Sequence, residues 1–252
     1  MTPEDALLVY VLRLGDNALI TGQRMIERVT GEPELEEELA NANFALDYIG
    51  QARLLYTLAG KLEGQGRDED DFAFLRDSQE FRNLLLAEQP NGHFGDAIVR
   101  QFLYESFYLL QLEALAGCSA PELPGIAARA QKEIAYHLRH AAQWLTRLGD
   151  GTPESHAKVA ASLERYWRFT GEFFAGDEVD DVVRDAFGGP DLAAIEPAWR
   201  QKVADVLAAA TLDMPADEPL AGSGRAGRHT EHLGYLVAEM QHLHRAHPSA
   251  TW

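Results

Sequence analysis

The sequence predicts an all-α protein organised around four long helices. Apolar residues recur at helical spacing over four stretches of about 22 to 29 residues each. Clusters of glycine and proline separate these stretches, and a long connection divides the first pair from the second. Helices of this length would span about 33–43 Å at 1.5 Å per residue, which suits a helix bundle.

The first helix is expected over residues 3–29. Thr2 and Pro3 suit a helix start, and the Thr-Gly-Glu-Pro sequence at residues 30–33 breaks the apolar pattern. The second helix is expected over residues 34–62, where acidic first turns complement the helix dipole. Its expected apolar stripe consists of Leu35, Leu39, Ala42, Leu46, Ile49, Ala52, Leu55 and Leu58.

Residues 63–94 are expected to form a crossover. This segment starts with the polar run 64–68 and ends with the turn signal Gln-Pro-Asn-Gly at residues 89–92. The third long helix is expected over residues 95–116 and the fourth over 123–148. A long crossover of this kind is typical of ferritin-like four-helix bundles, which is the fold class that the sequence favours.

Additional helices are expected in the C-terminal part of the chain. The pattern predicts them over residues 154–174, 196–211 and 231–245, and Pro197 would open the second of these. No boundary resembles an interdomain linker, so residues 1–252 are expected to form a single ferritin-like helical domain. Loops are expected at residues 188–190 and 213–228.

The chain is strongly acidic. It has 40 Asp and Glu residues against 22 Lys and Arg, a formal net charge of −18 at pH 7. Nucleic acids and anionic membranes bind clustered basic residues, so neither is an expected partner. The sequence has no apolar run of the ~18 residues that a membrane span needs, and its start does not resemble a secretory signal. With a single cysteine, Cys118, these features predict a protein of the reduced cytoplasm.

The expected fourth helix carries the most informative histidine. Ferritin-like di-iron proteins place a Glu-x-x-His pair on each of two helices, with both ligands on one helix face. His137 lies on an apolar stripe, but the residue three positions before it is Ile134, whose alkyl chain cannot bind iron. A buried histidine needs partners for its ring nitrogens, and Glu105 on the third helix is a suitable one. His137 is therefore either a buried histidine paired with a neighbour, which the sequence favours, or a metal ligand.

Two other segments have partial metal-binding patterns. On the second helix, Tyr48 and Gln51 occupy the i and i+3 positions of such a pair, and glutamine is a poor ligand for high-valent iron. The strict Glu-x-x-His pattern occurs once, as Glu239 and His242 on the last expected helix. Because no facing bundle helix carries a second copy, we interpret this pair as part of a solvated helix face.

The remaining polar candidates are expected to have structural roles. Asp16, Asn17 and Asp96 are interpreted as solvated or helix-capping residues. The glycine- and arginine-rich segment 222–229 could contact phosphate, but it precedes no βαβ unit. A mobile loop or a subunit contact is the favoured interpretation of this segment.

Several separate motifs together resemble a known family. They match the C subunits of multicomponent phenylacetyl-CoA epoxidases, and the match runs from about Leu12 to Trp252. The motifs lie at residues 13–17, 46–53, 83–92, 132–139, 167–170 and 227–234.

The resemblance implies a role within a larger oxygenase. The family's complex epoxidises the aromatic ring of phenylacetyl-CoA, using oxygen and electrons from NADPH that arrive through a reductase subunit. Its catalytic A subunit is a ferritin-like di-iron protein, and the C subunit is a diverged relative thought to support the A subunit. The resemblance therefore implies that the di-iron cofactor belongs to the catalytic partner and that this chain has no cofactor.

The catalytic subunit's ligand pattern, laid over this chain, implies a vestigial metal site. Only two of the six ligand positions, Glu105 and His137, keep a group that can bind metal. Asp47 and Lys132 are expected nearby, and Lys132 could reach inward to a buried carboxylate. No catalytic residue and no bound metal are expected in this chain. The six implied positions are Thr21, Tyr48, Gln51, Glu105, Ile134 and His137.

Three functions remain open at this point. The leading one is a non-catalytic structural subunit that pairs with the di-iron catalytic subunit and joins the other subunits of the complex. The alternatives are an active ferritin-like di-iron oxygenase subunit, with ligands elsewhere in the chain, and a ferritin-like metal-binding protein.

The first two helices are the expected interface with another subunit, or with a second copy of this chain when it is isolated. A helix that is apolar over much of its circumference is covered on more than one side. The alternative is that the crossover and the C-terminal helices provide that cover within the chain. The expected interface residues are Leu7, Leu8, Tyr10, Val11, Phe44, Tyr48, Leu54 and Tyr56.

Overall fold

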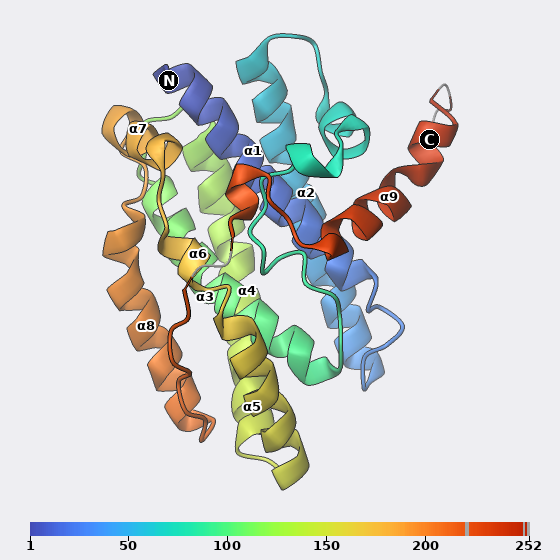
Figure 1. Ribbon diagram of the computed structural model, residues 1–252, viewed down its shortest axis with the longest axis vertical. Helices are drawn as coiled ribbons and strands as arrows, with labels where there is room; N and C mark the ends of the chain where they lie inside the picture. Colours follow the sequence, from blue (N-terminus) through green and yellow to red (C-terminus); the bar gives the residue numbers. More distant parts are fainter. Residues whose placement is uncertain (220–221, 249, 251–252) are drawn as a thin grey trace. The chain divides into compact units, whose positions relative to one another are not determined.

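The structure is a computed structural model that describes residues 1–219, 222–248 and 250 (Figure 1). Within these residues every regular element is helical, which confirms the predicted all-α class. None of the helices in this part of the chain is long and apolar enough to cross a membrane. The chain packs into two compact units, which we describe separately: unit 1 comprises residues 1–6 and 91–221, and unit 2 comprises residues 7–90 and 222–252. The single domain over residues 1–252 stays a prediction.

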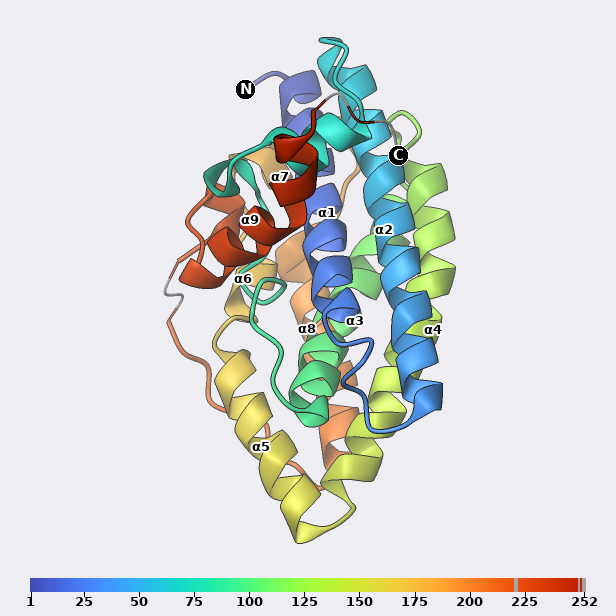
Figure 2. The same ribbon diagram turned by 90° about the vertical axis from the view of Figure 1, so that its right-hand side faces the viewer.

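Unit 2 contains most of the first helix and all of the second. Helix α1 (Pro3–Ile26) and helix α2 (Leu35–Glu63) lie side by side (Figure 2). A Cβ atom on Gly15 of α1 would lie 2.6 Å from the ring of Tyr56 on α2, so only glycine allows this close approach. Helix α2 ends at Gly64, whose φ of +68° is the left-handed conformation that glycine adopts most readily.

The crossover and the end of the chain complete unit 2. The crossover forms a π-helical turn (Asp71–Leu75) and a 3₁₀ turn (Ser78–Glu80). After unit 1 the chain returns through a second 3₁₀ turn (Gly224–Ala226) and ends in helix α9 (Glu231–Ala246), which packs on both crossover turns. Two residues of the loop predicted at 213–228, Leu220 and Ala221, lie outside the described residues.

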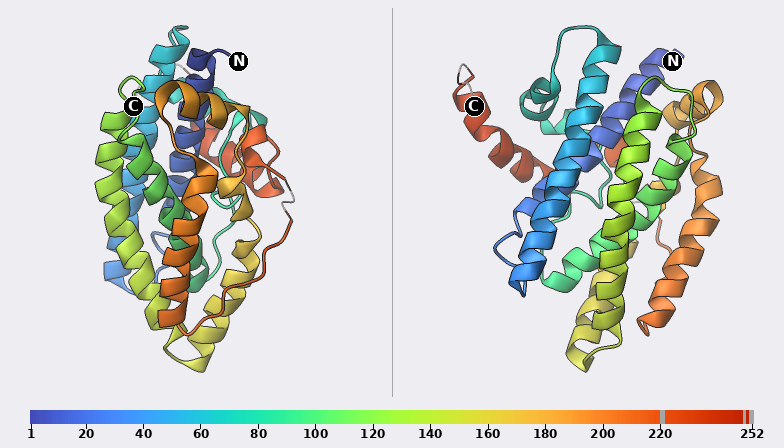
Figure 3. Two further views of the ribbon diagram at one scale, coloured as in Figure 1. Left: turned by 90° about the vertical axis from the view of Figure 1, so that its left-hand side faces the viewer. Right: turned by 180° about the vertical axis from the view of Figure 1, so that it is seen from behind.

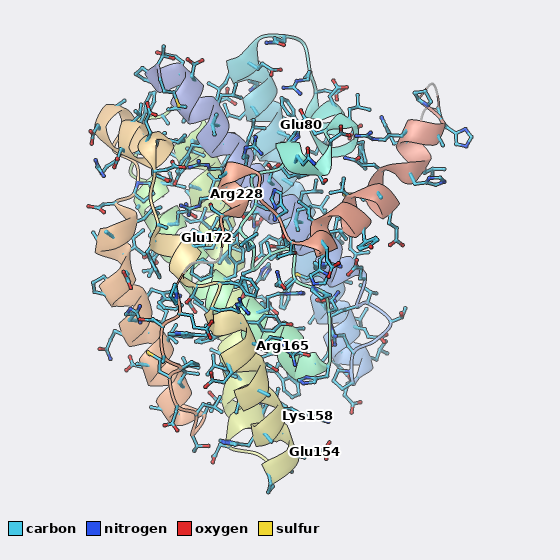
Figure 4. All side chains as sticks on the ribbon, viewed as in Figure 1. Glu80, Glu154, Lys158, Arg165, Glu172 and Arg228 are labelled. Atoms are coloured by element: carbon cyan, nitrogen blue, oxygen red, sulfur yellow. The ribbon has the colours of Figure 1, made fainter. Side chains whose placement is uncertain are left out.

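Unit 1 is built around the third and fourth long helices, which pack side by side (Figure 3). Buried residues surround almost the whole circumference of α3, whereas those of α4 follow one stripe. At the start of α3, Asp96 accepts a capping hydrogen bond from the backbone N–H of His93. It also accepts hydrogen bonds from Ser162 (2.7 Å) and Arg165 (3.0 Å) of α5, the helix on which Figure 4 labels Arg165. Capping was expected for Asp96, but its side chain is buried rather than solvated. The helices of unit 1 are α3 (Phe94–Leu115), α4 (Leu123–Gly149), α5 (Pro153–Trp167), α6 (Gly171–Phe174), α7 (Glu178–Phe187) and α8 (Leu192–Ala209).

The C-terminal part of unit 1 departs from the sequence prediction in three places. The helix predicted over residues 154–174 is interrupted after Trp167 and resumes as the short helix α6. Helix α7 was not predicted, although Asp177 caps its start and Gly188, at φ +70°, ends it. Helix α8 begins before Pro197 rather than at it, because Asp191 caps the helix one and a half turns earlier and proline removes only one backbone donor.

Candidate functional site

Helices α3 and α4 bring two of the predicted site residues together. Glu105 and His137 are both fully buried, and Nδ1 of His137 lies 3.5 Å from Oε1 of Glu105. The same carboxylate oxygen accepts a hydrogen bond of 3.0 Å from Nε2 of Gln101, one turn earlier on α3. A protonated imidazole at this distance forms an ion pair with the carboxylate, which offsets part of the cost of burying both groups.

The position one turn before His137 holds no ligand. Ile134 is fully buried in the core of unit 1, on the same face of α4 as His137. The i, i+3 register of a Glu-x-x-His pair is thus preserved, while a saturated side chain replaces the carboxylate. At these two positions α4 therefore presents one group that could bind a metal rather than two.

The remaining three positions implied by the family pattern lie in unit 2. Tyr48 and Gln51 are buried one turn apart on α2, and Thr21 is half-buried on α1. Their phenol, amide and alcohol groups are not the carboxylates and imidazole that a di-iron centre uses. Asp47 is half-buried, and Lys132 is exposed. The expectation that Lys132 reaches inward is wrong, because a lysine on the polar face of α4 keeps its charge in water at no cost.

These residues do not fit a di-iron centre. Two irons in a bundle are normally held by four carboxylates and two histidines. At the implied positions unit 1 offers one of each, and those two groups already contact each other. Across the described residues, no group of three or more His, Cys, Asp or Glu side chains is arranged to hold a metal ion. We therefore assign no chemical step to a metal in this chain.

The strict Glu-x-x-His segment of α9 has a different role. Glu239 and His242 are exposed, whereas Gln241 between them is buried. The amide of Gln241 donates hydrogen bonds to the carbonyl oxygens of Ala73 (3.0 Å) and Arg76 (2.8 Å) in the crossover. The segment thus anchors α9 to carbonyl groups left open at the end of the π-helical turn.

A buried charge network in unit 2 was missed by the sequence analysis. Asp16 is fully buried, so its interpretation as a solvated or capping residue is wrong. Its carboxylate accepts hydrogen bonds from the hydroxyl of Tyr56 (2.6 Å), from both terminal nitrogens of Arg76, and from the backbone N–H of Arg82 (2.7 Å). Its neighbour Asn17 is also buried and accepts a hydrogen bond of 2.7 Å from the backbone N–H of Leu84.

Electrostatics keep this network in one protonation state. Burial raises the pKa of the Tyr56 hydroxyl well above its usual value, and the negative charge of Asp16 raises it further. Burial alone would lower the pKa of Arg76, but the attraction of Asp16 and Tyr56 outweighs it, so the pKa rises. At neutral pH Tyr56 is therefore a neutral donor and Arg76 a cation, as the hydrogen bonds require.

A second buried carboxylate ties the loop before α9 to the crossover. Glu88 is fully buried and accepts hydrogen bonds from the backbone N–H (2.6 Å) and hydroxyl (2.8 Å) of Thr230, and from Asn83 (2.9 Å). Nδ1 of His229 lies 2.7 Å from Glu88, and its Nε2 lies 2.9 Å from the carbonyl oxygen of Phe81. Since both neighbours are acceptors, both ring nitrogens donate, and His229 is an imidazolium.

The arrangement around Glu88 corrects the interpretation of segment 222–229. Arg225 is buried within it, and Gly224 approaches the carbonyl oxygen of Asn83 so closely that no Cβ would fit. The segment, which also carries Arg228 (Figure 4), packs against the crossover, so a free loop is wrong here, whereas the alternative of a subunit contact stays a prediction. No single local pattern would have shown this, because the partners are more than 140 residues apart.

Replacing His137 by alanine is expected to lower the free energy of unfolding by about 1–3 kcal/mol, because Glu105 would keep a buried carboxylate with fewer partners. Thermal denaturation followed by circular dichroism measures the effect. Tyr136→Ala, at the exposed neighbouring position of α4, is the matched control and should change stability little. An unchanged melting temperature for the His137 variant would mean that water solvates the pair.

Comparison with known proteins supports the resemblance found in the sequence. A family model described as "Phenylacetic acid catabolic protein" matches residues 1–252. The C subunit of the 1,2-phenylacetyl-CoA epoxidase of Escherichia coli (strain K12) is 43% identical over 246 residues, which cover 98% of this chain and 99% of that protein. The resemblance to epoxidase C subunits and the ferritin-like fold class are thereby confirmed.

Proposed function

The chain belongs to the phenylacetic acid catabolic protein family, and on that basis we propose that it is a non-catalytic accessory subunit of a phenylacetyl-CoA epoxidase. Support comes from the 43% identity with a named C subunit across nearly the whole of both chains. In this proposal the di-iron centre and the epoxidation chemistry belong to a catalytic partner, the A subunit. This chain contributes structure to the complex and holds no cofactor.

One observation carries the proposal. In unit 1, Glu105 and His137 contact each other directly, and Ile134 takes the place of the missing carboxylate. In unit 2, Tyr48 and Gln51 occupy the two positions of the other histidine motif. Burying uncharged or mutually paired groups costs much less than burying unpaired carboxylates, so these replacements suit a chain that folds without metal.

Iron content tests this proposal directly. The chain purified from iron-replete cells is expected to contain well under one iron per molecule and to show no oxygenase activity alone. The catalytic subunit from the same cells is the positive control, with about two irons per chain. A comparable iron content in this chain would overturn the proposal in favour of an active di-iron subunit or a metal-binding protein.

Complex formation tests the other half of the proposal. Co-expression with the catalytic subunit should give one complex that survives size-exclusion chromatography. Failure of the two chains to associate would argue against an accessory role even if no iron were found.

A further inference from the structure

Three leucines of α2 lie on the surface of unit 2. Leu35, Leu39 and Leu46 are 66%, 57% and 66% exposed. Spacings of four and seven residues place them within about 40° of one another around the helix, at 100° per residue. They belong to the apolar stripe expected from the sequence, but this part of the stripe faces away from the core. They lie on one side of α2, the helix whose ribbon Figure 2 shows, and we call them the leucine line.

The interface residues expected from the sequence lie elsewhere. Six of them, on α1 and α2, are buried within the chain, so the alternative of internal cover is correct for these positions. Leu8 is half-buried, and Leu54 is 36% exposed. The buried six are Leu7, Tyr10, Val11, Phe44, Tyr48 and Tyr56.

A pocket adjoins the C-terminal end of this leucine line. It has a volume of about 300 Å³ and lies within unit 2, between α1, α2 and the π-helical turn. Ile49 and Arg53, which follow Leu46 by three and seven residues on the same side of α2, form its rim. Apolar walls come from Leu19, Ala52, Ala73 and Phe74, while Gln23, Glu69 and Asp70 line the remainder. The volume suits one large side chain rather than a substrate of coenzyme size.

The charge around the leucine line indicates what would cover it. Residues 34–53 contain five acidic side chains and one basic one, Arg53, which pairs with Glu69 at 3.1 Å. A second copy of this chain would bring a like net charge of −18 against this surface, which disfavours self-association. A partner with lysine or arginine beside an apolar helix would complement it.

We propose that Leu35, Leu39 and Leu46, with the adjoining pocket, form the surface on which the di-iron catalytic subunit docks an apolar helix flanked by basic residues. We call this surface the α2 face. The proposal rests on the proposed accessory function. From Leu35 to Arg53 the face is about 27 Å long at 1.5 Å per residue, enough for several turns of a partner helix. A large apolar side chain of that helix fills the pocket as an anchor, since anchors in pockets carry most of the free energy of binding.

The first test combines Leu39→Asp with Leu46→Asp. Its readout is the dissociation constant for the purified di-iron catalytic subunit, measured by calorimetry. The double variant should bind at least about 100-fold more weakly, because two carboxylates would be buried in the contact. Leu243→Asp, at a 53% exposed leucine of α9, is the matched control and should bind like the wild type. All three positions are exposed, so helix content and melting temperature should not change.

The second test uses a pair of opposite charges at one position. Asn43 is exposed on α2 beside the leucine line. Asn43→Lys should weaken binding of the catalytic subunit and Asn43→Glu should strengthen it, and the difference should shrink at high salt. Equal effects of the two variants would contradict the proposal that the partner helix is flanked by basic residues.

The remaining outcomes separate this inference from the proposed function. If the wild type binds the catalytic subunit and the leucine variant binds equally well, the α2 face is not the docking surface, while the accessory function stands. If the wild type does not bind at all, both proposals fail. If the isolated chain is a dimer by sedimentation and the leucine variant is a monomer, the occupant is a second copy and the proposed partner is overturned.

Discussion

Asp16→Ala is expected to lower the free energy of unfolding by about 3–5 kcal/mol, because it leaves the guanidinium of Arg76 buried without its counter-charge. The hydroxyl of Tyr56 and the backbone N–H of Arg82 lose their acceptor in the same substitution. Domains of this kind are stable by about 5–15 kcal/mol in total, so the loss is a large fraction of the whole. Urea denaturation followed by circular dichroism near neutral pH measures it.

Two further variants show whether the cause is the buried pair. Glu154→Ala removes an exposed carboxylate that pairs with Lys158 one turn later on α5 (Figure 4), and no measurable change is expected. In an Arg76→Met background, Asp16→Ala should cost much less than in the wild type, since the unpaired cation is absent. If the two substitutions were additive, the proposed coupling between Asp16 and Arg76 would be wrong.

The second large effect is expected for Glu88→Gln, which should lower the free energy of unfolding by about 2–4 kcal/mol. The carboxylate has two acceptor oxygens, one facing Thr230 and the other facing both His229 and Asn83. The amide has only one acceptor oxygen, so its NH₂ group must face the donors on one of these two sides. The same substitution removes the negative charge beside the imidazolium of His229. Urea denaturation at several pH values measures both consequences.

The pH dependence of stability identifies the role of His229. Burial alone would lower the pKa of this imidazole, but the hydrogen bond and charge of Glu88 outweigh burial and raise the pKa above its usual value. A raised pKa in the folded state contributes stability that is fully present below about pH 6.5, the unfolded value. That contribution is lost as the pH rises through the folded pKa. Glu88→Gln should flatten this decline, and Glu239→Gln, at an exposed glutamate of α9, should leave it unchanged.

The long helices could be predicted from the sequence because their signals are local. Apolar spacing, acidic first turns and the glycine and proline breaks all lie within one or two turns of the boundaries that they mark. Helix α1 ends at Ile26 rather than residue 29, and α2 begins at Leu35 rather than residue 34, which is the usual uncertainty of helix ends. The pairing of His137 with Glu105 could also be predicted, since His137 lies on the apolar stripe of one long helix and Glu105 among the apolar residues of its neighbour.

The buried carboxylates of unit 2 could not be predicted, because nothing local distinguishes them from solvated ones. Asp16 finds Tyr56 and Arg76 at separations of 40 and 60 residues, and Glu88 finds His229 at 141. The exposure of the leucines of α2 could not be predicted for a related reason. Apolar residues surround most of this helix, and periodicity alone does not indicate which side meets the core. Leu55 and Leu58 are buried as predicted, whereas Leu35, Leu39 and Leu46 are not.

The division of unit 2 between the two ends of the chain has a consequence for biosynthesis. Residues 7–90 leave the ribosome first, yet the partners of Glu88 at Thr230 and His229 follow only after all of unit 1 has been made. Unit 1 consists almost entirely of the continuous segment 91–221. It can therefore complete its folding before unit 2, although most of unit 2 is translated first. During that interval the nascent chain carries a carboxylate destined for burial that lacks two of its partners. Residues 7–90 can therefore complete their native packing only after the last segment of unit 2 has been made.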